Sequence, residues 1–225
     1  MTTLDNILEL LKINEMENKQ FAEKLGITES TIEEWISGEN KSYLDYLDAI
    51  SDLFVIPIDC IKQEVESQNS NVESNSFFLY CPICGLNYCQ IEEDIETHKK
   101  VHEEYLKAVE LFGFNWHYSK REKVKFHCWK VIYDNEVTNE KKQIAILNIV
   151  RCYFSRSVEG YSFELNKHPK FNDYFAMMLH ADSLKGVKEN LTHDKYNELI
   201  EKYGLKEGIK SGYSYYMGSS NNSNK

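Results

Sequence analysis

Two cysteines followed by two histidines constrain this chain more than any other feature of its sequence. Cys81 and Cys84 lie in the run FLYCPICGLNY, and His98 and His102 follow it. The run is typical of a strand, a tight Cys-x2-Cys turn and a second strand. The histidine spacing places both imidazoles on one face of a helix, where they can meet the turn. Two thiolates and two imidazoles arranged in this way predict one tetrahedral, structural Zn²⁺ site.

The same residues argue against an enzyme. A catalytic zinc needs an open coordination position, and four protein ligands leave none. His102-Glu103 matches the start of the metalloprotease motif His-Glu-x-x-His, but Leu106 stands at the place of the second histidine. Cys89 lies beyond the turn and is not expected to be a ligand. Because no nucleophile–base pair or phosphate-binding loop is found either, the sequence predicts a non-enzymatic protein.

Residues 77–106 resemble the two-Cys, two-His zinc finger family, with Tyr88 and Ile95 at the places of its apolar plug. The resemblance implies a small ββα unit. In DNA-reading fingers, the first part of the helix faces the bases. Here that part is rich in acidic side chains, and it contains Glu92, Glu93, Asp94, Glu96 and Thr97. Because carboxylates repel phosphates, we expect this finger to act as a scaffold or protein contact.

Residues 4–62 show apolar residues at helical spacing, and the whole segment resembles a known DNA-binding domain. The run at 18–42, NKQFAEKLGITESTIEEWISGENKS, resembles the helix-turn-helix (HTH) of phage-repressor-like (Cro/XRE family) regulators. The residues at the family's core and turn positions are Phe21, Ala22, Leu25, Gly26, Ile32, Trp35 and Gly38. The resemblance implies a compact helical domain whose third helix enters the major groove of double-stranded DNA, usually as a homodimer on a two-fold site.

The resemblance also implies which side chains contact DNA. Asn18 and Lys41 would contact phosphates, and the residues facing the bases would come from the third helix, 28–37. The full implied set is Asn18, Thr28, Glu29, Ser30, Thr31, Glu34 and Lys41.

The charge of this segment supports a second interpretation. Of the chain's net charge of −10, residues 1–65 carry −9, from 14 acidic and 5 basic side chains. A carboxylate can accept a hydrogen bond from the cytosine amino group. Acidic groups nevertheless oppose phosphate neutralisation, which supplies most of the affinity for DNA. The alternative is therefore a protein–protein interaction adaptor built on an acidic HTH scaffold, because fold alone does not fix function.

The sequence predicts a mainly α fold with three folded parts. These are an N-terminal HTH bundle at 1–63, a ββα finger at 77–113 and a helical C-terminal domain at 114–215. The polar segment 64–76 is expected to be a flexible linker and 216–225 a disordered tail. In the C-terminal domain, apolar spacing predicts helices at 119–133, 139–157, 172–184 and 192–203, with most aromatic residues in the core.

The sequence also predicts where the protein is located and what it does. No apolar run approaches the roughly 18 residues of a membrane span, and the N-terminus does not have the pattern of a signal peptide. We therefore expect a cytoplasmic protein without a membrane partner, in which Cys60, Cys128 and Cys152 are reduced, buried residues. The predicted function is that of a sequence-specific, repressor-like transcription regulator.

Overall fold

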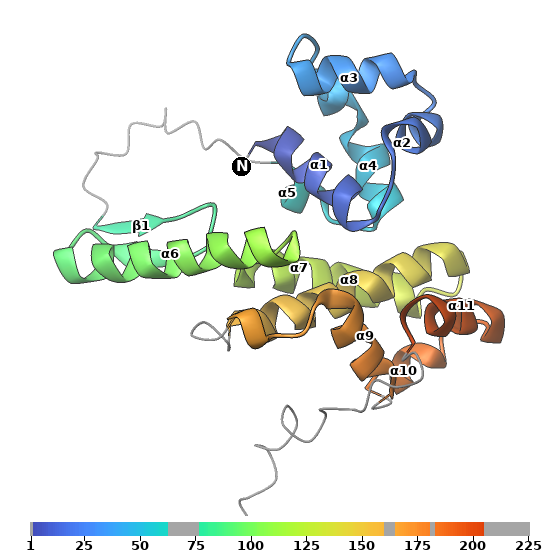
Figure 1. The fold of residues 1–225 in the computed structure, drawn as a ribbon. Helices are drawn as coiled ribbons and strands as arrows, with labels where there is room; N and C mark the ends of the chain where they lie inside the picture. Colours follow the sequence, from blue (N-terminus) through green and yellow to red (C-terminus); the bar gives the residue numbers. More distant parts are fainter. Residues whose placement is uncertain (1, 63–76, 160–164, 181–182, 205–225) are drawn as a thin grey trace, which may run out of the picture.

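The computed structural model describes residues 2–62, 77–159, 165–180 and 183–204, which are predominantly helical (Figure 1). This confirms the mainly α class. The expected linker at 64–76 and tail at 216–225 lie outside the described residues, as do residues 205–215. None of the helices in the described ranges combines the length and apolarity that a membrane span requires.

The N-terminal unit contains five α-helices around one core. They are α1 (Thr3–Ile13), α2 (Asn18–Leu25), α3 (Glu29–Ser37), α4 (Leu47–Phe54) and α5 (Ile58–Ile61). Four of the predicted core residues, Phe21, Ala22, Ile32 and Trp35, are buried, and Leu25 is half-buried. The spacing of apolar residues thus identifies the face that each helix turns inward.

Apolar residues recur at helical spacing from Leu44 to Phe54, but the fourth helix begins later than this spacing predicts. The pattern starts at Leu44, but a 3-10 helix, η1 (Ser42–Tyr46), precedes α4, and Leu44 is exposed. The Trp35 indole explains the difference, because its Nε1 donates to Ser42 Oγ at 3.0 Å. The rings of Tyr43 and Tyr46 lie 6.0 and 5.7 Å from the Trp35 ring. The tighter turn thus seats both tyrosines against this indole.

The second unit is a two-stranded ribbon followed by a long helix. Strand β1 (Phe78–Tyr80) pairs antiparallel with β2 (Asn87–Cys89), with Leu79 opposite Tyr88. Helix α6 (Glu92–Phe112) follows and ends at Gly113. A short connection with three buried residues, Phe114, Asn115 and Trp116, then leads into the C-terminal helices.

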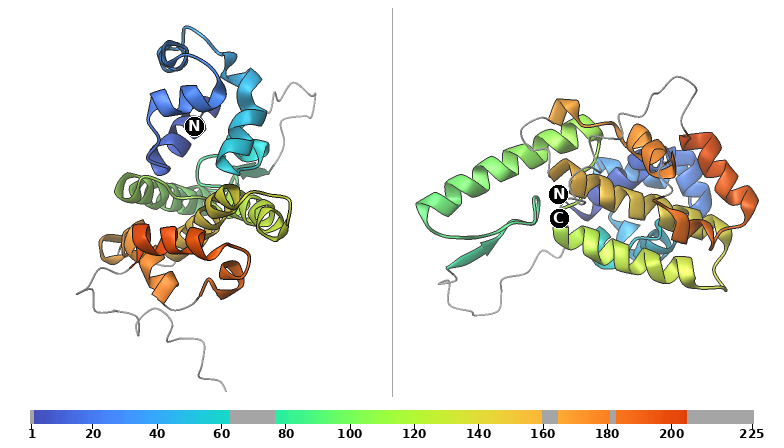
Figure 2. Two further views of the ribbon diagram at one scale, coloured as in Figure 1. Left: turned by 90° about the vertical axis from the view of Figure 1, so that its right-hand side faces the viewer. Right: turned by 90° about the horizontal axis from the view of Figure 1, so that it is seen from below.

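The C-terminal helices pack around α7 (Tyr118–Tyr133) and α8 (Asn139–Glu159), which lie side by side (Figures 1 and 2). The remaining elements are η2 (Leu165–Lys167), α9 (Phe171–His180), α10 (Lys185–Lys188) and α11 (His193–Tyr203). Helices α9 and α11 pack against α8 and against each other. The helix predicted at 172–184 therefore ends at 180, and a separate short helix follows at 185–188.

Aromatic residues of this part divide between core and surface. The buried Phe154 ring contacts the rings of Phe112, Phe114, Phe171, His168 and Tyr174. Phe126 and Tyr133 on α7 are instead 65% and 60% exposed. Helical spacing alone did not separate these two from the core aromatics.

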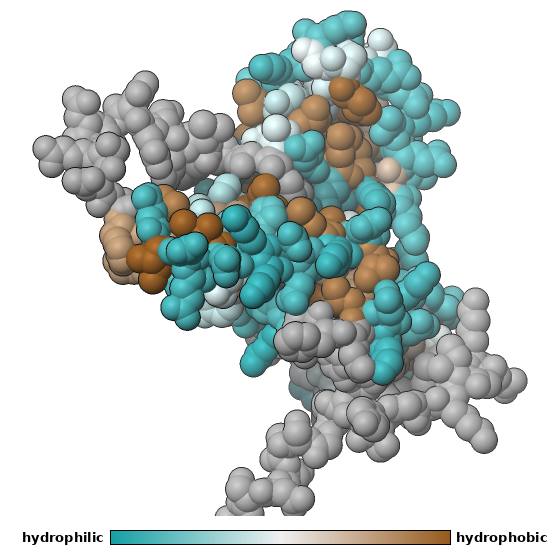
Figure 3. Space-filling view, turned by 60° about the vertical axis from the view of Figure 1, so that its left-hand side comes forward, coloured by the Kyte–Doolittle hydropathy of each residue, from teal (hydrophilic) through white to brown (hydrophobic). Residues whose placement is uncertain are grey.

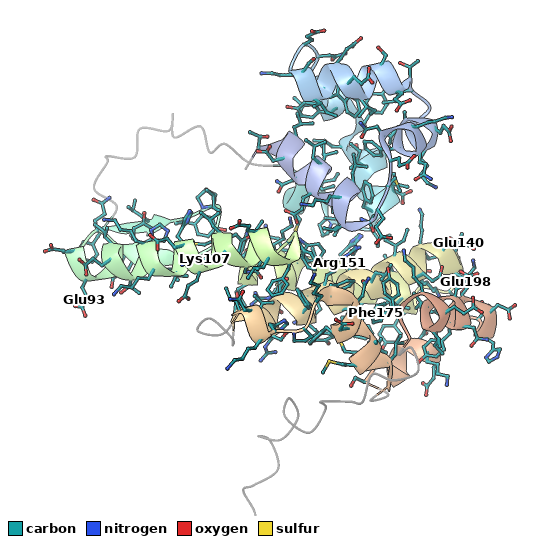
Figure 4. The ribbon with its side chains drawn as sticks, viewed as in Figure 1. Glu93, Lys107, Glu140, Arg151, Phe175 and Glu198 are labelled. Carbon is teal, nitrogen blue, oxygen red and sulfur yellow. The ribbon has the colours of Figure 1, made fainter. Side chains whose placement is uncertain are left out.

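The N-terminal unit rests directly on the C-terminal helices through polar groups of α8 (Figure 4). Arg151 is 1% exposed, and its Nη2 donates to the Ile13 carbonyl at 2.7 Å. Both terminal nitrogens of Arg151 also lie 3.2 Å from Asn14 Oδ1. Asn148 Nδ2 donates to the carbonyls of Phe54 and Val55 at 2.8 and 3.2 Å. The side chains of α8 therefore bind the carboxyl ends of α1 and α4.

Burial lowers the pKa of Arg151 to about 10, so the guanidinium remains charged at neutral pH. A buried charge of this kind is tolerated only when hydrogen bonds replace its water. The acceptors that Arg151 contacts would in turn lose their partner if the side chain were removed.

We predict that Arg151→Met lowers the free energy of unfolding by about 3 kcal/mol, because buried acceptors on α1 and α8 lose a charged donor. Arg156→Met is the matched control, since Arg156 is exposed on the same helix. Chemical denaturation followed by circular dichroism measures both. Equal losses in the two variants would contradict the assigned role of Arg151.

Candidate metal centre and nucleic-acid interface

Cys81, Cys84, His98 and His102 come together in a group that can hold a metal ion. Their potential ligand atoms all lie within 4.8 Å of one another. The two cysteines are buried and the two histidines half-buried. Cys81 Sγ lies 3.4 Å from His102 Nδ1, although 21 residues separate them in sequence.

The turn between the strands positions the cysteines by its backbone hydrogen bonds. The Gly85 amide donates to the Cys81 carbonyl at 2.8 Å, and the Cys81 amide donates to the Leu86 carbonyl at 2.9 Å. Gly85 has φ +72°, a left-handed conformation that side chains other than glycine rarely adopt. The turn therefore closes on itself and places both thiols toward α6.

His98 has the protonation state and the orientation that a metal ligand needs. The His98 ring stacks on Tyr88, with ring centroids 4.1 Å apart and planes 11° apart. His98 Nε2 is buried and has no hydrogen-bond partner within the described part of the chain. Burial, and secondarily His102, lowers the pKa of His98, which favours the neutral imidazole that binds metals. A buried imidazole nitrogen that has no hydrogen-bond partner in the described ranges and lies next to two thiols fits the role of a metal ligand.

The donor set fits a cation on the cysteine side as well. Burial raises the pKa of the Cys84 thiol, so a thiolate at this position needs a nearby positive charge. Cys89 does not belong to the group. Its amide donates to Asp94 Oδ2 at 3.0 Å, at the start of α6. Two sulfur and two nitrogen donors are the set that structural zinc sites use.

The surface of the finger is poorly suited to phosphates. Glu92, Glu93 and Asp94 occupy the first turn of α6. Apolar side chains are exposed near the strands, where Figure 3 shows hydrophobic residues gathered, and they include Phe77, Phe78 and Ile91. Neither surface offers the cations that bind a nucleic-acid backbone.

The turn also touches a residue that the sequence did not single out as part of this site. A Cβ atom added at Gly85 would lie 2.4 Å from His117 Nδ1. His117 caps the start of α7, where its Nδ1 accepts from the Lys120 amide at 3.4 Å. Burial, and next the nearby Lys120, lowers the pKa of His117 to about 4 and keeps this nitrogen an acceptor. No local pattern in the sequence indicates that these residues meet.

The residues implied to contact DNA lie at the far end of the N-terminal unit. Helix α3 is at the opposite side of this unit from α7–α11 (Figures 1 and 2). Thr28, Glu29, Ser30 and Lys41 are exposed, and Asn18, Thr31 and Glu34 are half-buried. The C-terminal helices therefore do not cover the start of α3.

Two of these residues also support the local structure. Thr28 Oγ1 accepts from the Thr31 amide at 3.3 Å and so caps α3. Glu34 Oε2 accepts from Asn40 Nδ2 at 3.2 Å and thereby helps to hold the turn after α3. Glu29 and Ser30, in the first turn of α3, are both exposed, and among the described residues neither is used for a cap or turn contact of this kind.

Comparison with known protein families identifies the N-terminal unit. Residues 6–59 match the model of the Cro/C1-type HTH DNA-binding domain. This segment therefore supports a DNA-binding regulator. No curated protein and no solved structure matches the chain.

The close approach of Gly85 to His117 leads to a prediction about stability. We expect Gly85→Ala to lower the free energy of unfolding of the metal-loaded protein by about 1–3 kcal/mol more than Gly26→Ala does. Gly26 also has a positive φ, +68°, but nothing lies within 4 Å of a Cβ added there. Gly26→Ala therefore reproduces the backbone strain of an alanine at positive φ, but not the steric overlap with a neighbouring side chain. Equal losses in chemical denaturation would show that the turn does not press on His117.

Proposed function

We propose that this protein is a sequence-specific, repressor-like transcription regulator that binds double-stranded DNA through residues 1–63. The observation that carries the proposal is a Cro/C1-type domain whose α3 begins with exposed polar residues at a free end of the molecule. In this arrangement α3 enters the major groove. A homodimer would present two such helices to a two-fold site, roughly 34 Å apart.

The side chains of α3 define the proposed base contacts. Glu29 and Glu34 can accept from cytosine amino groups, whereas Ser30 and Thr31 can donate or accept. Asn18 and Lys41 are the proposed phosphate contacts. Lys19 and Lys24 on α2 are exposed and can add to the local positive charge. With so few cations, specific base contacts have to supply an unusually large share of the affinity.

The proposed cofactor is one structural Zn²⁺ held by Cys81, Cys84, His98 and His102. Its support is the donor set, the close approach of the four ligand atoms and the unpaired His98 nitrogen. Four ligands close the coordination shell, so the ion would stabilise residues 77–113 without acting on a substrate. The helical part from 114 onward then serves as the body to which the other two units attach.

DNA capture tests the first part of the proposal. Sheared genomic DNA retained by the intact, zinc-loaded protein should yield a discrete site when sequenced. We expect the double variant Ser30→Ala, Thr31→Ala to lose at least about 10-fold in affinity for that site, because each base contact contributes roughly 1–3 kcal/mol. Ser37→Ala, at the opposite end of α3, should bind normally. Retention of no DNA even at low salt would refute the regulator.

Metal analysis tests the second part. We expect the wild type and Cys89→Ser to retain one zinc ion per chain after dialysis, as measured by mass spectrometry of the metal. Cys84→Ser should lose the ion and the fold of the finger, because structural zinc supplies roughly 10 kcal/mol or more of folding free energy. The helices of residues 1–63 should persist in both variants. A Cys84→Ser protein that keeps its zinc would refute the ligand set.

The acidic character of α3 favours a second candidate, a non-enzymatic adaptor that binds a basic protein surface. Residues 1–65 carry a net charge of −9, and Glu29 and Glu33 are exposed on α3. Affinity purification with and without nuclease separates the two functions. A partner that stays bound after the nuclease treatment would support the adaptor, and one that is released would support the regulator.

A further inference from the structure

The connection between α6 and α7, residues 113–117, joins the three units of the molecule. Trp116, at its centre, is 1% exposed. Its amide donates to Ser155 Oγ on α8 at 3.0 Å, and its indole Nε1 donates to Glu9 Oε1 on α1 at 2.7 Å. Trp116 thus links α8 through its main-chain amide to the first helix of the DNA-binding domain through its indole.

The metal-binding unit contacts this connection from both of its halves. On the cysteine side, Gly85 lies against His117, the residue after Trp116. On the histidine side, Tyr105 comes three residues after His102 on α6, and its hydroxyl donates to the Asn115 carbonyl. The position of residues 115–117 therefore depends on both the turn and the helix that carry the ligands.

The contact with the DNA-binding domain is enclosed and charged. Lys120 Nζ lies 3.5 Å from Glu9 Oε1, and each side chain is only 11% exposed. The same ammonium lies 5.4 Å from the centre of the Trp116 ring. Arg121 holds the main chain of Trp116, because its Nη1 donates to the Trp116 carbonyl at 2.8 Å. An enclosed ion pair with these neighbours tolerates little displacement, since separating it would leave a poorly solvated charge unpaired.

From these contacts we propose that metal binding at the Cys–His cluster sets the position of the DNA-binding domain, so that zinc occupancy and DNA binding are coupled. The inference rests on the proposed function. Zinc-bound ligands would hold the turn and α6 together. The contacts of His117 and Tyr105 would then fix the position of Trp116, and through it the position of Glu9 on α1. Coupling is reciprocal, so DNA should raise zinc affinity by the factor by which zinc raises DNA affinity. Coupling factors of this kind are roughly 5–150-fold.

A structural test needs no DNA. The protein contains three tryptophans, and 5-fluorotryptophan labelling gives each a separate fluorine resonance. Trp35 reports the core of the DNA-binding domain, Trp116 the connection and Trp129 the carboxyl-terminal part of α7. We expect zinc removal by a chelator to shift the Trp116 resonance and to speed amide hydrogen exchange in α1, while Trp35 keeps its shift. An unchanged Trp116 resonance, or unchanged exchange in α1, would overturn the proposal.

A variant then tests the route. His117→Ser retains a residue that can cap α7 but removes the ring that lies against Gly85. We expect it to bind one zinc ion per chain and to show a reduced effect of zinc on α1 exchange, because only the Tyr105 contact with Asn115 remains. His127→Ser, on the same helix, is the control and should keep that effect. If His117→Ser does not fold, Trp116→Phe tests the other end of the route by removing the donor to Glu9. A variant that folds and retains the full zinc effect would overturn the proposal.

Affinity measurements separate this inference from the proposed function. With a captured DNA site, the zinc-loaded protein should bind at least about 5-fold more tightly than the zinc-free protein. Equal affinities would overturn the coupling and leave the regulator intact. If neither form binds DNA, the regulator fails, and the coupling of zinc to the position of the acidic domain is then decided by the α1 exchange alone.

Discussion

The arrangement of the molecule depends on the hydrogen-bond donors that the last carbonyls of two helices, α1 and α4, receive. The last carbonyls of a helix have no partner within it and carry partial negative charge. Helices α1 and α4 turn these ends toward α8, where Arg151 and Asn148 supply the donors. A guanidinium is favourable at the carboxyl end of a helix. The buried charge of Arg151 and the last carbonyls of α1 therefore stabilise each other. This contact fixes which side of the N-terminal domain remains available to a partner.

Features set by local spacing could be predicted from the sequence. The core positions Phe21 and Trp35 follow from helical periodicity, and the metal cluster follows from ligand types and intervals. Contacts between distant segments could not be predicted, because nothing near Arg151 in the sequence distinguishes it from the exposed Arg156. For the same reason, the contact of Gly85 with His117 cannot be predicted from the sequence. The resemblance of 18–42 to an HTH identifies a domain, but it does not indicate which side of that domain packs against the C-terminal helices.

Lysines of the C-terminal helices offset part of the negative charge of the N-terminal domain. Glu9 pairs with Lys120, Glu15 with Lys202 and Asp52 with Lys141, and all three lysines belong to the C-terminal helices. Pairs as exposed as the last two add little stability. They nevertheless offset part of the net charge of −9 carried by residues 1–65. The isolated N-terminal domain would therefore repel phosphates more strongly than the same domain does within the whole protein.

The sequence separation across the Arg151 contact also bears on how the chain forms during synthesis. Arg151 lies 138 residues beyond the Ile13 carbonyl that it binds. The contacts inside the N-terminal domain are far more local and can form first, since short-range contacts carry a smaller loop-closure cost. On the ribosome, the helices of this domain can therefore fold before α8 has been translated. Docking is then a late step, and until it occurs the nascent domain keeps the carboxyl ends of α1 and α4 in water.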